Sequence, residues 1–127
     1  MKDTLKPGMS SEKTITTTPD MGISHMGPSV PSMFSTPAMI MLMEGACVEF
    51  LTPHMSAGEQ TVGFHVNVKH LAPTKIGQNV RAKVTLNEIK GRRLLFTVEA
   101  FNEEDGAKVG DGTHERAVVE IARFAGH

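Results

Sequence analysis

Residues 35–53, STPAMIMLMEGACVEFLTP, carry the strongest structural signal in this sequence. Thr36 offers a capping hydroxyl and Pro37 follows at the first helical position, which are two signals that start helices. The pair Thr52-Pro53 ends the pattern, so the stretch predicts a helix of about fifteen residues. Because nearly every side chain between these signals is apolar, we expect the helix to be buried on most of its circumference.

Alternating apolar and polar residues predict strands on both sides of this helix. Before it lies one short segment rich in β-branched residues, and after it come four longer segments joined by short turns, which indicates an antiparallel meander. In the first of the four, the even positions are apolar, and counting by two places His70 on that face. The expected strands are residues 12–18, 61–70, 80–86, 94–100 and about 107–124, the last with a bulge at 110–112.

The order of elements predicts an α+β fold in which one curved antiparallel sheet wraps a single long apolar helix. Residues 19–35 contain several prolines and glycines and predict a long connection of the kind that often forms a lid over a binding site. The helix is too apolar for one sheet face to cover alone. We therefore expect a dimer-forming protein whose second subunit closes the remaining side.

Length and composition limit the classes of function. A chain of 127 residues predicts a single domain, residues 1–127. The net charge of −1 supplies no broad positive field for nucleic acid, and the longest apolar run, residues 38–43, is too short to span a membrane. Cys47 is the single cysteine and no apolar leader is present at the N-terminus. These features predict a cytoplasmic protein with no nucleic-acid or membrane partner.

Glu44 is the first candidate for chemistry. Its helical neighbours one turn away are apolar, so its carboxylate is partly desolvated and suited to acid–base work. Glu49 is the second acidic residue of the helix, about 140° further around the axis. The residue pattern alone leaves open which of the two is buried, and the central position in the helix favours Glu44.

His70 and Thr36 are the other two candidates. His70 ends a strand at the rim of the apolar face and titrates near neutral pH, although a purely structural histidine fits the same position. Thr36 has a helix-capping role as its alternative. Thr36 and Glu44 are eight residues apart, about 12 Å of helix rise. They therefore meet only if Thr36 lies in a loop that folds back, or else they contact different parts of a ligand.

The cysteine and the histidines are weaker candidates for a functional site. Cys47 lies in the apolar helix and is expected in the core, where burial makes a thiol unreactive. The six histidines show no metal-ligand spacing, so no metal site is expected.

Three blocks of the sequence resemble one known family. They are Thr36 with LMEGACV at residues 42–48, VKHLAPTKIGQNV at 68–80 and GTHERAV at 112–118. Over residues 31–124 the chain resembles the hotdog-fold thioesterases of the fluoroacetyl-CoA thioesterase type. The resemblance implies a hotdog fold that dimerises through its sheet and hydrolysis of an acyl-CoA to the free acid and CoA. CoA enters only as part of the substrate, and no cofactor is implied.

The resemblance also assigns residues. It implies Thr36, Glu44 and His70 as the catalytic set and Gly63 and Arg116 as substrate-binding residues. It thereby favours Glu44 over the second acidic residue of the helix.

The chain departs from the family pattern near the expected lid. Gly27 and Val30 stand where the family carries gating phenylalanines, and only Phe34 is close by. We therefore expect weak selection for a fluorinated acyl group. The predicted activity is hydrolysis of a small or medium acyl-CoA by a homodimer or a tetramer. The alternative is a non-catalytic hotdog module that binds an acyl-CoA or another small ligand.

Overall fold

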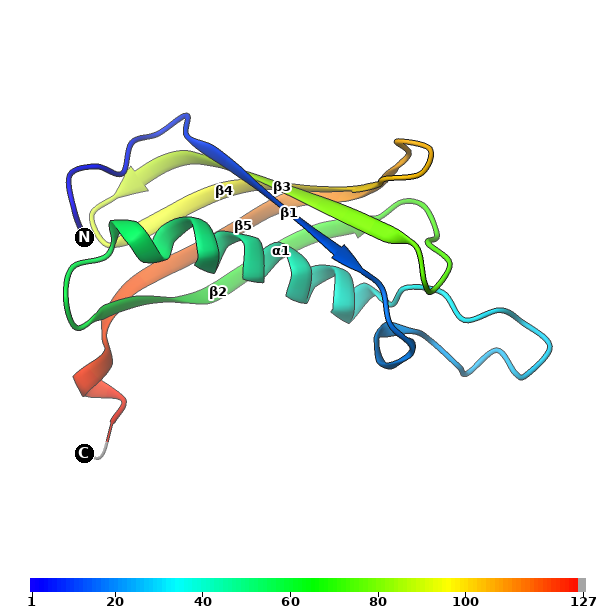
Figure 1. Ribbon diagram of the computed structural model, residues 1–127. Coiled ribbons are helices and arrows are strands. Elements are labelled where there is room, and N and C mark those ends of the chain that lie inside the picture. The colour runs from blue at the N-terminus through cyan, green and yellow to red at the C-terminus, as the bar shows by residue number, and fades with distance from the viewer. Residues whose placement is uncertain (126–127) are drawn as a thin grey trace.

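The computed structural model describes residues 1–125, in which one α-helix packs against a five-stranded antiparallel sheet (Figure 1). Helix α1 spans Thr36–Leu51; it ends where its stop signal predicts and begins one residue earlier than expected. The strands are β1 (Ser10–Thr16), β2 (Glu59–His70), β3 (Asn79–Lys90), β4 (Arg93–Asn102) and β5 (Lys108–Glu120). Short 3₁₀ helices lie at Pro19–Met21, Thr52–His54 and Ile121–Arg123. The predicted α+β arrangement is thus confirmed.

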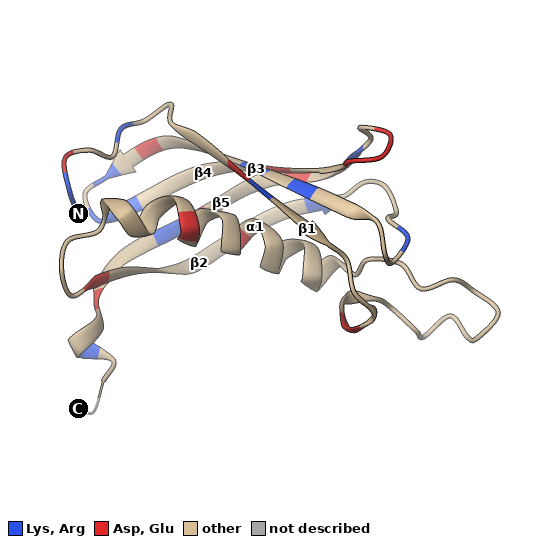
Figure 2. Ribbon diagram, in the orientation of Figure 1, with Lys and Arg blue, Asp and Glu red and all other residues tan. Residues whose placement is uncertain are grey.

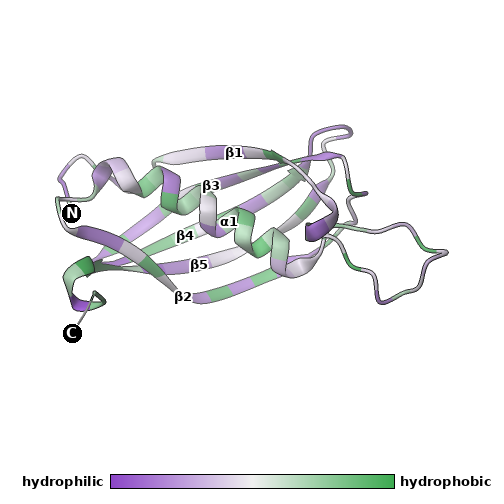
Figure 3. Cartoon of the chain, turned by 60° about the horizontal axis from the view of Figure 1, so that its bottom comes forward, coloured by the Kyte–Doolittle hydropathy of each residue, from purple (hydrophilic) through white to green (hydrophobic). Residues whose placement is uncertain are grey.

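The strand order in the sheet is β1-β3-β4-β5-β2. Strands β3, β4 and β5 form the predicted meander, but β2 pairs with β5 and lies at one edge of the sheet (Figure 3). The prediction that all four later strands pair in succession was therefore wrong. Residues 71–78 are long enough to carry the chain from this edge to β3 across the end of the sheet.

The core lies between α1 and the concave face of the sheet. Met39, Met43 and Leu51 of the helix pack with Phe96 and other inward side chains of the central strands. Cys47 belongs to the same core and is fully buried, and burial raises the pKa of its thiol to about 12. The prediction that this cysteine is a core residue is confirmed.

Strand boundaries differ from the predictions by up to four residues. Strand β1 begins at Ser10 and ends at Thr16, two residues earlier than expected. Strand β5 ends at Glu120, where the chain turns into a 3₁₀ helix.

The predicted bulge at residues 110–112 was also misplaced, because the register between β4 and β5 slips at Val109. The side chain of Val109 is buried in the core, which explains why the extra residue lies there.

Strand β2 contains a second bulge, at Phe64, which changes the face that its side chains point to. Gly63 before the bulge faces the helix, and so do Val66 and His70 after it, as their pairing with inward residues of β5 requires. The prediction that all even positions share the inner face was wrong for Val62 and Phe64, which are exposed on the other face. An extra residue in a strand moves all the following side chains to the opposite face of the sheet, and the hydropathy pattern of the sequence does not reveal it.

The connection between β1 and α1 projects from one end of the sheet (Figure 1). Its residues 21–35 carry no Lys, Arg, Asp or Glu, in contrast to the charged strands and turns (Figure 2). Isolated bridges pair Gly22 with Phe34 and Met33 with Lys75, which attach the base of the loop to the body. In the described residues, no helix is long and apolar enough to cross a membrane.

Candidate functional site

Thr36 and His70 form a hydrogen-bonded pair at the start of α1. The helix is capped by Ser35, whose Oγ accepts a bond of 3.2 Å from the backbone N–H of Ala38, so the prediction of Thr36 as the N-cap was wrong. As the first helical residue, Thr36 has its hydroxyl available for another partner. Its Oγ1 lies 2.8 Å from Nδ1 of His70 at the end of β2.

His70 is held in a partly buried position. Burial lowers the pKa of its imidazole, and the backbone of Ala72 opposes part of that effect. Its Nε2 is buried and finds no hydrogen-bond partner among residues 1–125. A buried polar atom without a partner is costly and is often found where a ligand or a catalytic step uses it. His70 thus has one nitrogen bonded to Thr36 and a second, buried nitrogen whose hydrogen-bonding capacity is unused among the described residues.

A hollow of about 440 Å³ lies beside this pair. Its polar lining residues are His25, Ser35, Thr36 and His70. The apolar lining consists of Ile23, Met26, Met33, Phe34, Leu71, Ala72 and Pro73. A mostly apolar hollow with a few polar groups is suited to a small molecule with one reactive polar centre.

Glu44 lies two turns further along α1 and faces the sheet. Its Oε2 is 3.1 Å from Nη1 of Arg116 on β5. Glu49, by contrast, pairs with Lys13 at 2.5 Å, and its side chain is 63 % exposed against 38 % for Glu44. The preference for Glu44 over Glu49 therefore agrees with the observed geometry.

Arg116 is buried and has several hydrogen-bond partners. Two of these partners, Thr61 and His114, were not predicted as site residues from the sequence. Its Nε donates to Oγ1 of Thr61 at 2.9 Å, and its Nη2 donates to the carbonyl oxygen of Thr61 at 3.0 Å. Its Nη1 lies 3.1 Å from Nε2 of His114. The spacing of His114 and Arg116 within GTHERAV, two residues apart on one strand, already places both on one face.

Gly63 provides the space in which these side chains meet. A Cβ on residue 63 would lie 2.6 Å from Oε2 of Glu44, 2.8 Å from Cε1 of His114 and 3.1 Å from Nη1 of Arg116. A side chain of any size would displace at least one of them. Gly63 thus belongs with Glu44, His114 and Arg116, a cluster called the Glu44 group below, even though it has no side chain of its own.

The predicted site residues therefore form two groups within one chain. Thr36 and His70 lie at the start of α1, and Glu44, Gly63 and Arg116 lie near its middle. Because Thr36 is inside the helix, the alternative in which it folds back onto Glu44 was wrong. About 12 Å of helix rise separates the two groups.

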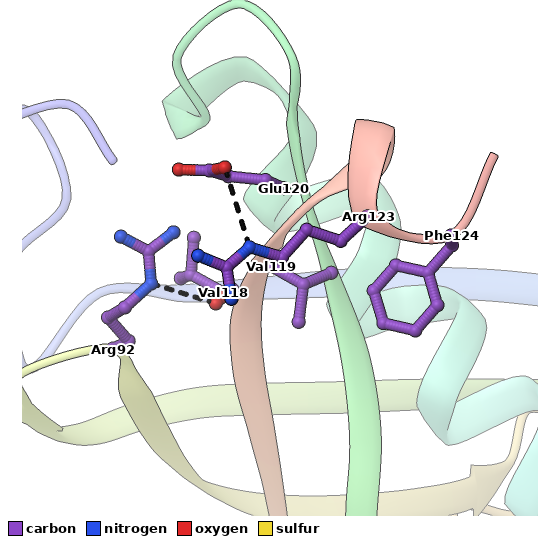
Figure 4. A pocket seen from close by; sticks show the side chains of 6 residues that line it. All are labelled: Arg92, Val118, Val119, Glu120, Arg123 and Phe124. Atoms are coloured by element: carbon purple, nitrogen blue, oxygen red, sulfur yellow. Dashed lines mark hydrogen bonds and ion pairs between the residues drawn. The ribbon is translucent and has the colours of Figure 1, made fainter. Parts of the chain in front are cut away.

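A further hollow of about 420 Å³ lies at the end of β5 (Figure 4). Two arginines and a phenyl ring line it: Arg92, Arg123 and Phe124. Arg92 donates from Nε to the carbonyl oxygen of Val118 at 3.0 Å and from Nη2 to Oε2 of Glu59 at 3.4 Å. Nε of Arg123 lies 3.7 Å from Oε2 of Glu120, so both arginines already have one carboxylate neighbour.

In the described part of the chain, no three His, Cys, Asp or Glu side chains converge in a way that could hold a metal ion. His127, the last of the six histidines considered for such a site, lies outside the described residues.

Sequence comparisons identify relatives over nearly the whole chain. The model of the family described as fluoroacetyl-CoA-specific thioesterase matches residues 17–122. The fluoroacetyl-CoA thioesterase of Streptantibioticus cattleyicolor is 34 % identical over 130 residues, which covers 98 % of this chain and 92 % of the relative.

Solved structures lead to the same family. A mutant of the fluoroacetyl-CoA-specific thioesterase in complex with fluoroacetate and CoA is 32 % identical, with a TM-score of 0.85 over 94 % of this chain and 99 % of that one. A thioesterase superfamily member of Thermus thermophilus is 29 % identical, with a TM-score of 0.84 over 94 % and 87 %. The predicted hotdog fold is confirmed by these neighbours. The chain belongs to the fluoroacetyl-CoA-specific thioesterase family, and it is an acyl-CoA thioester hydrolase.

Proposed function

We propose that this protein hydrolyses the CoA thioester of a small or medium apolar acyl group, with Thr36, Glu44 and His70 as its catalytic residues. The observation that carries the proposal is the 2.8 Å contact between Thr36 and His70, which both line a mostly apolar hollow. A hydroxyl paired with an imidazole that has a free second nitrogen is equipped to move a proton.

The reaction converts the thioester and one water into the carboxylic acid and the CoA thiol. Glu44 either attacks the carbonyl carbon to form a mixed anhydride, which water then hydrolyses, or it takes a proton from the attacking water. In both routes the C–S bond breaks, and His70 delivers the proton that the departing sulfur needs. Thr36 orients the acyl carbonyl. Backbone N–H groups near the helix start or at Gly63 are proposed to stabilise the oxyanion.

A dimer is proposed to bring the two groups of residues together. Strand β2 lies at the sheet edge, and its Val62, Phe64 and Val66 are exposed, which is unusual for apolar side chains on an unpaired edge. If two copies of β2 pair antiparallel about their centres, the His70 end of one strand lies beside the Gly63 half of the other. The second copy's Glu44 then approaches the Thr36–His70 pair.

The lining of the hollow favours an apolar acyl group. Met26 and Met33 are flexible side chains that adapt to acyl groups of different size. Gly27 and Val30 of the projecting loop put no aromatic ring over the opening, and Phe34 is buried. The proposed substrate is therefore a small or medium apolar acyl group, with little discrimination between acetyl and fluoroacetyl.

Arg92 and Arg123 are proposed to bind phosphates of CoA, because both guanidinium groups line one hollow (Figure 4). CoA is the only cofactor-like molecule proposed, and it enters as part of the substrate. The cytoplasm is the proposed location.

Release of free thiol from a panel of CoA esters tests the proposed function. The panel contains acetyl, fluoroacetyl, propionyl, butyryl, hexanoyl, phenylacetyl and benzoyl esters, with wild type measured beside Glu44→Gln. We expect turnover with one or more esters and its loss in Glu44→Gln, while thermal unfolding shows that the variant is folded. Binding of the esters without thiol release would instead identify a non-catalytic acyl-CoA binding module.

A further inference from the structure

His114 lies on β5 beside the Glu44 group and has a defined tautomer. Its side chain is 2 % exposed, and its Nδ1 lies 2.8 Å from the carbonyl oxygen of His65 on β2. Because a carbonyl oxygen only accepts hydrogen bonds, Nδ1 must carry the proton. In the neutral ring, Nε2 is then an acceptor, and it points at Nη1 of Arg116 at 3.1 Å.

The guanidinium of Arg116 is fixed by this acceptor on one side and by Thr61 on the other. Nε and Nη2 both bond to Thr61, which sets the plane of the group. Nη1 has two hydrogens and two neighbours: Nε2 of His114 and Oε2 of Glu44, each at 3.1 Å. When His114 accepts one hydrogen, the fixed geometry of the guanidinium directs the other at Glu44.

The surroundings of His114 keep its ring in the neutral form that this arrangement needs. Burial lowers the pKa of His114, and the positive charge of Arg116 lowers it further, while Glu44 and the His65 carbonyl oppose these effects. The imidazole of His65 acts in the same direction as Arg116. A protonated ring would put two cations against each other and would turn Nε2 into a donor facing a donor.

We propose that His114 is a positioning residue for the hydrolysis: it holds Arg116 in the orientation that aligns the carboxylate of Glu44 with the thioester. The inference rests on the proposed function, because it requires Glu44 to act on the substrate. Gly63 completes the arrangement, since the three side chains meet where its Cβ would lie. A misalignment of about 1 Å at a reacting group can lower a rate by roughly 100-fold.

Two conservative variants separate the two hydrogen bonds of His114. In His114→Asn, the amide lies near the former Nδ1 and keeps a donor for the His65 carbonyl, but the acceptor for Arg116 is lost. In His114→Gln, the longer side chain places an amide oxygen near the former Nε2 and restores that acceptor. A merely structural histidine would show no preference for Gln over Asn in turnover.

The experiment measures kcat and KM with the best ester of the panel for wild type, His114→Asn, His114→Gln and Glu44→Gln. We expect kcat to fall roughly 10- to 100-fold in His114→Asn with little change in KM, and to recover most of its value in His114→Gln. If both variants keep wild-type kcat, or lose it equally with intact folding, the proposal is wrong while the proposed function stands. Wild-type turnover in Glu44→Gln would overturn the role of Glu44 and this inference together.

A spectroscopic readout on the wild-type protein covers the case in which a variant does not fold. Long-range ¹H–¹⁵N correlation of the histidine rings distinguishes a protonated Nδ1 from a protonated Nε2. We expect His114 to be neutral with the proton on Nδ1 at neutral pH. A proton on Nε2, or on both nitrogens, would remove the acceptor that orients Arg116 and would overturn the proposal.

Discussion

Gly63 lies directly against the carboxylate of Glu44, so that a Cβ on residue 63 would come within 2.6 Å of Oε2. The same Cβ would lie 2.8 Å from Cε1 of His114. We predict that Gly63→Ala forces Glu44 out of its position and lowers kcat roughly 10- to 100-fold. Residue 63 itself is exposed, but the clash with Glu44 and His114 should also reduce the free energy of unfolding by about 1–3 kcal/mol. Steady-state kinetics and denaturant unfolding measure the two effects.

Gly45 supplies a matched control on the helix itself. It is adjacent to Glu44, but a Cβ there would have no atom within 4 Å in the described residues. Gly45→Ala should keep wild-type kcat and stabilise the helix by up to about 1 kcal/mol, since glycine is a weak helix former. Equal kinetic losses in Gly45→Ala and Gly63→Ala would show that the effect is not specific to the Glu44 group.

The neighbouring hydroxyls of Ser35 and Thr36 should separate helix capping from catalysis. Ser35 caps α1, so Ser35→Ala should cost about 1 kcal/mol of stability and leave kcat within a few-fold of wild type. Thr36→Val removes the partner of His70 without touching the cap and should lower kcat roughly 100-fold or more. Thr36→Ser should retain most activity. A kcat for Thr36→Val close to that of wild type would exclude the hydroxyl from the chemistry.

The contrast between these two hydroxyls also shows what the sequence can predict. The helix over residues 37–51 follows from its start and stop signals and its apolar run, and in the structure it begins one residue earlier, at Thr36. Which hydroxyl caps the helix depends on one residue of register, and Ser35 and Thr36 are both competent caps. The chemical role of Thr36 depends on that difference, because a capping hydroxyl is already occupied.

The cluster of Glu44, Gly63, His114 and Arg116 could not be predicted from the alternation of apolar and polar residues alone. The bulge at Phe64 reverses the alternation of β2, and nothing in its apolar pattern marks the extra residue. The pattern continues through Val62 and Phe64 although both are exposed. The pairing of β2 with β5 places Gly63 opposite Arg116, and that long-range contact cannot be read from local sequence. The role of His114 depends on both.

The stability of the protein should depend on pH through its buried histidines. Burial lowers the pKa of both His70 and His114 in the folded chain below the usual value of about 6.5. The unfolded chain therefore binds more protons than the folded one as the pH falls below that value. The free energy of unfolding then decreases on acidification, by at most about 1.4 kcal/mol per pH unit for each group.

His114→Gln isolates one of these contributions. We predict that unfolding free energies measured from about pH 7.5 down to about pH 5.5 fall less steeply in His114→Gln than in wild type. Glu44, Arg116 and His65 face the same group and remain in both proteins. Identical slopes would mean that His114 takes up no more protons on unfolding than an exposed histidine.

The hollow at the end of β5 should contribute to binding and not to the chemical step. Arg92→Ala and Arg123→Ala are each predicted to raise KM for CoA esters roughly 3- to 10-fold, the effect of losing about 1 kcal/mol, with kcat unchanged. Added salt should reduce the difference from wild type, because it screens exposed charges. Arg81→Ala is the control, since Arg81 pairs with Glu12 and Glu103 elsewhere on the sheet. Equal KM changes in all three variants would point to a general charge effect.

The edge strand β2 should control both assembly and activity. We predict that the wild-type protein has about twice the mass of the 13.7 kDa chain in solution. Val66 is exposed on this edge, so Val66→Lys should place a charge in the subunit contact and produce monomers. Because the second copy's Glu44 then no longer reaches Thr36 and His70, turnover should fall with assembly.

Thr14→Lys is the matched control for this prediction, because it adds the same charge to an exposed position of β1, the opposite edge of the sheet. It should remain dimeric and active. Light scattering coupled to size-exclusion chromatography gives the mass, and thiol release gives the activity of the same fractions. A monomeric Val66→Lys with wild-type kcat would show that one chain holds a complete site, and that the two groups along α1 act without a partner.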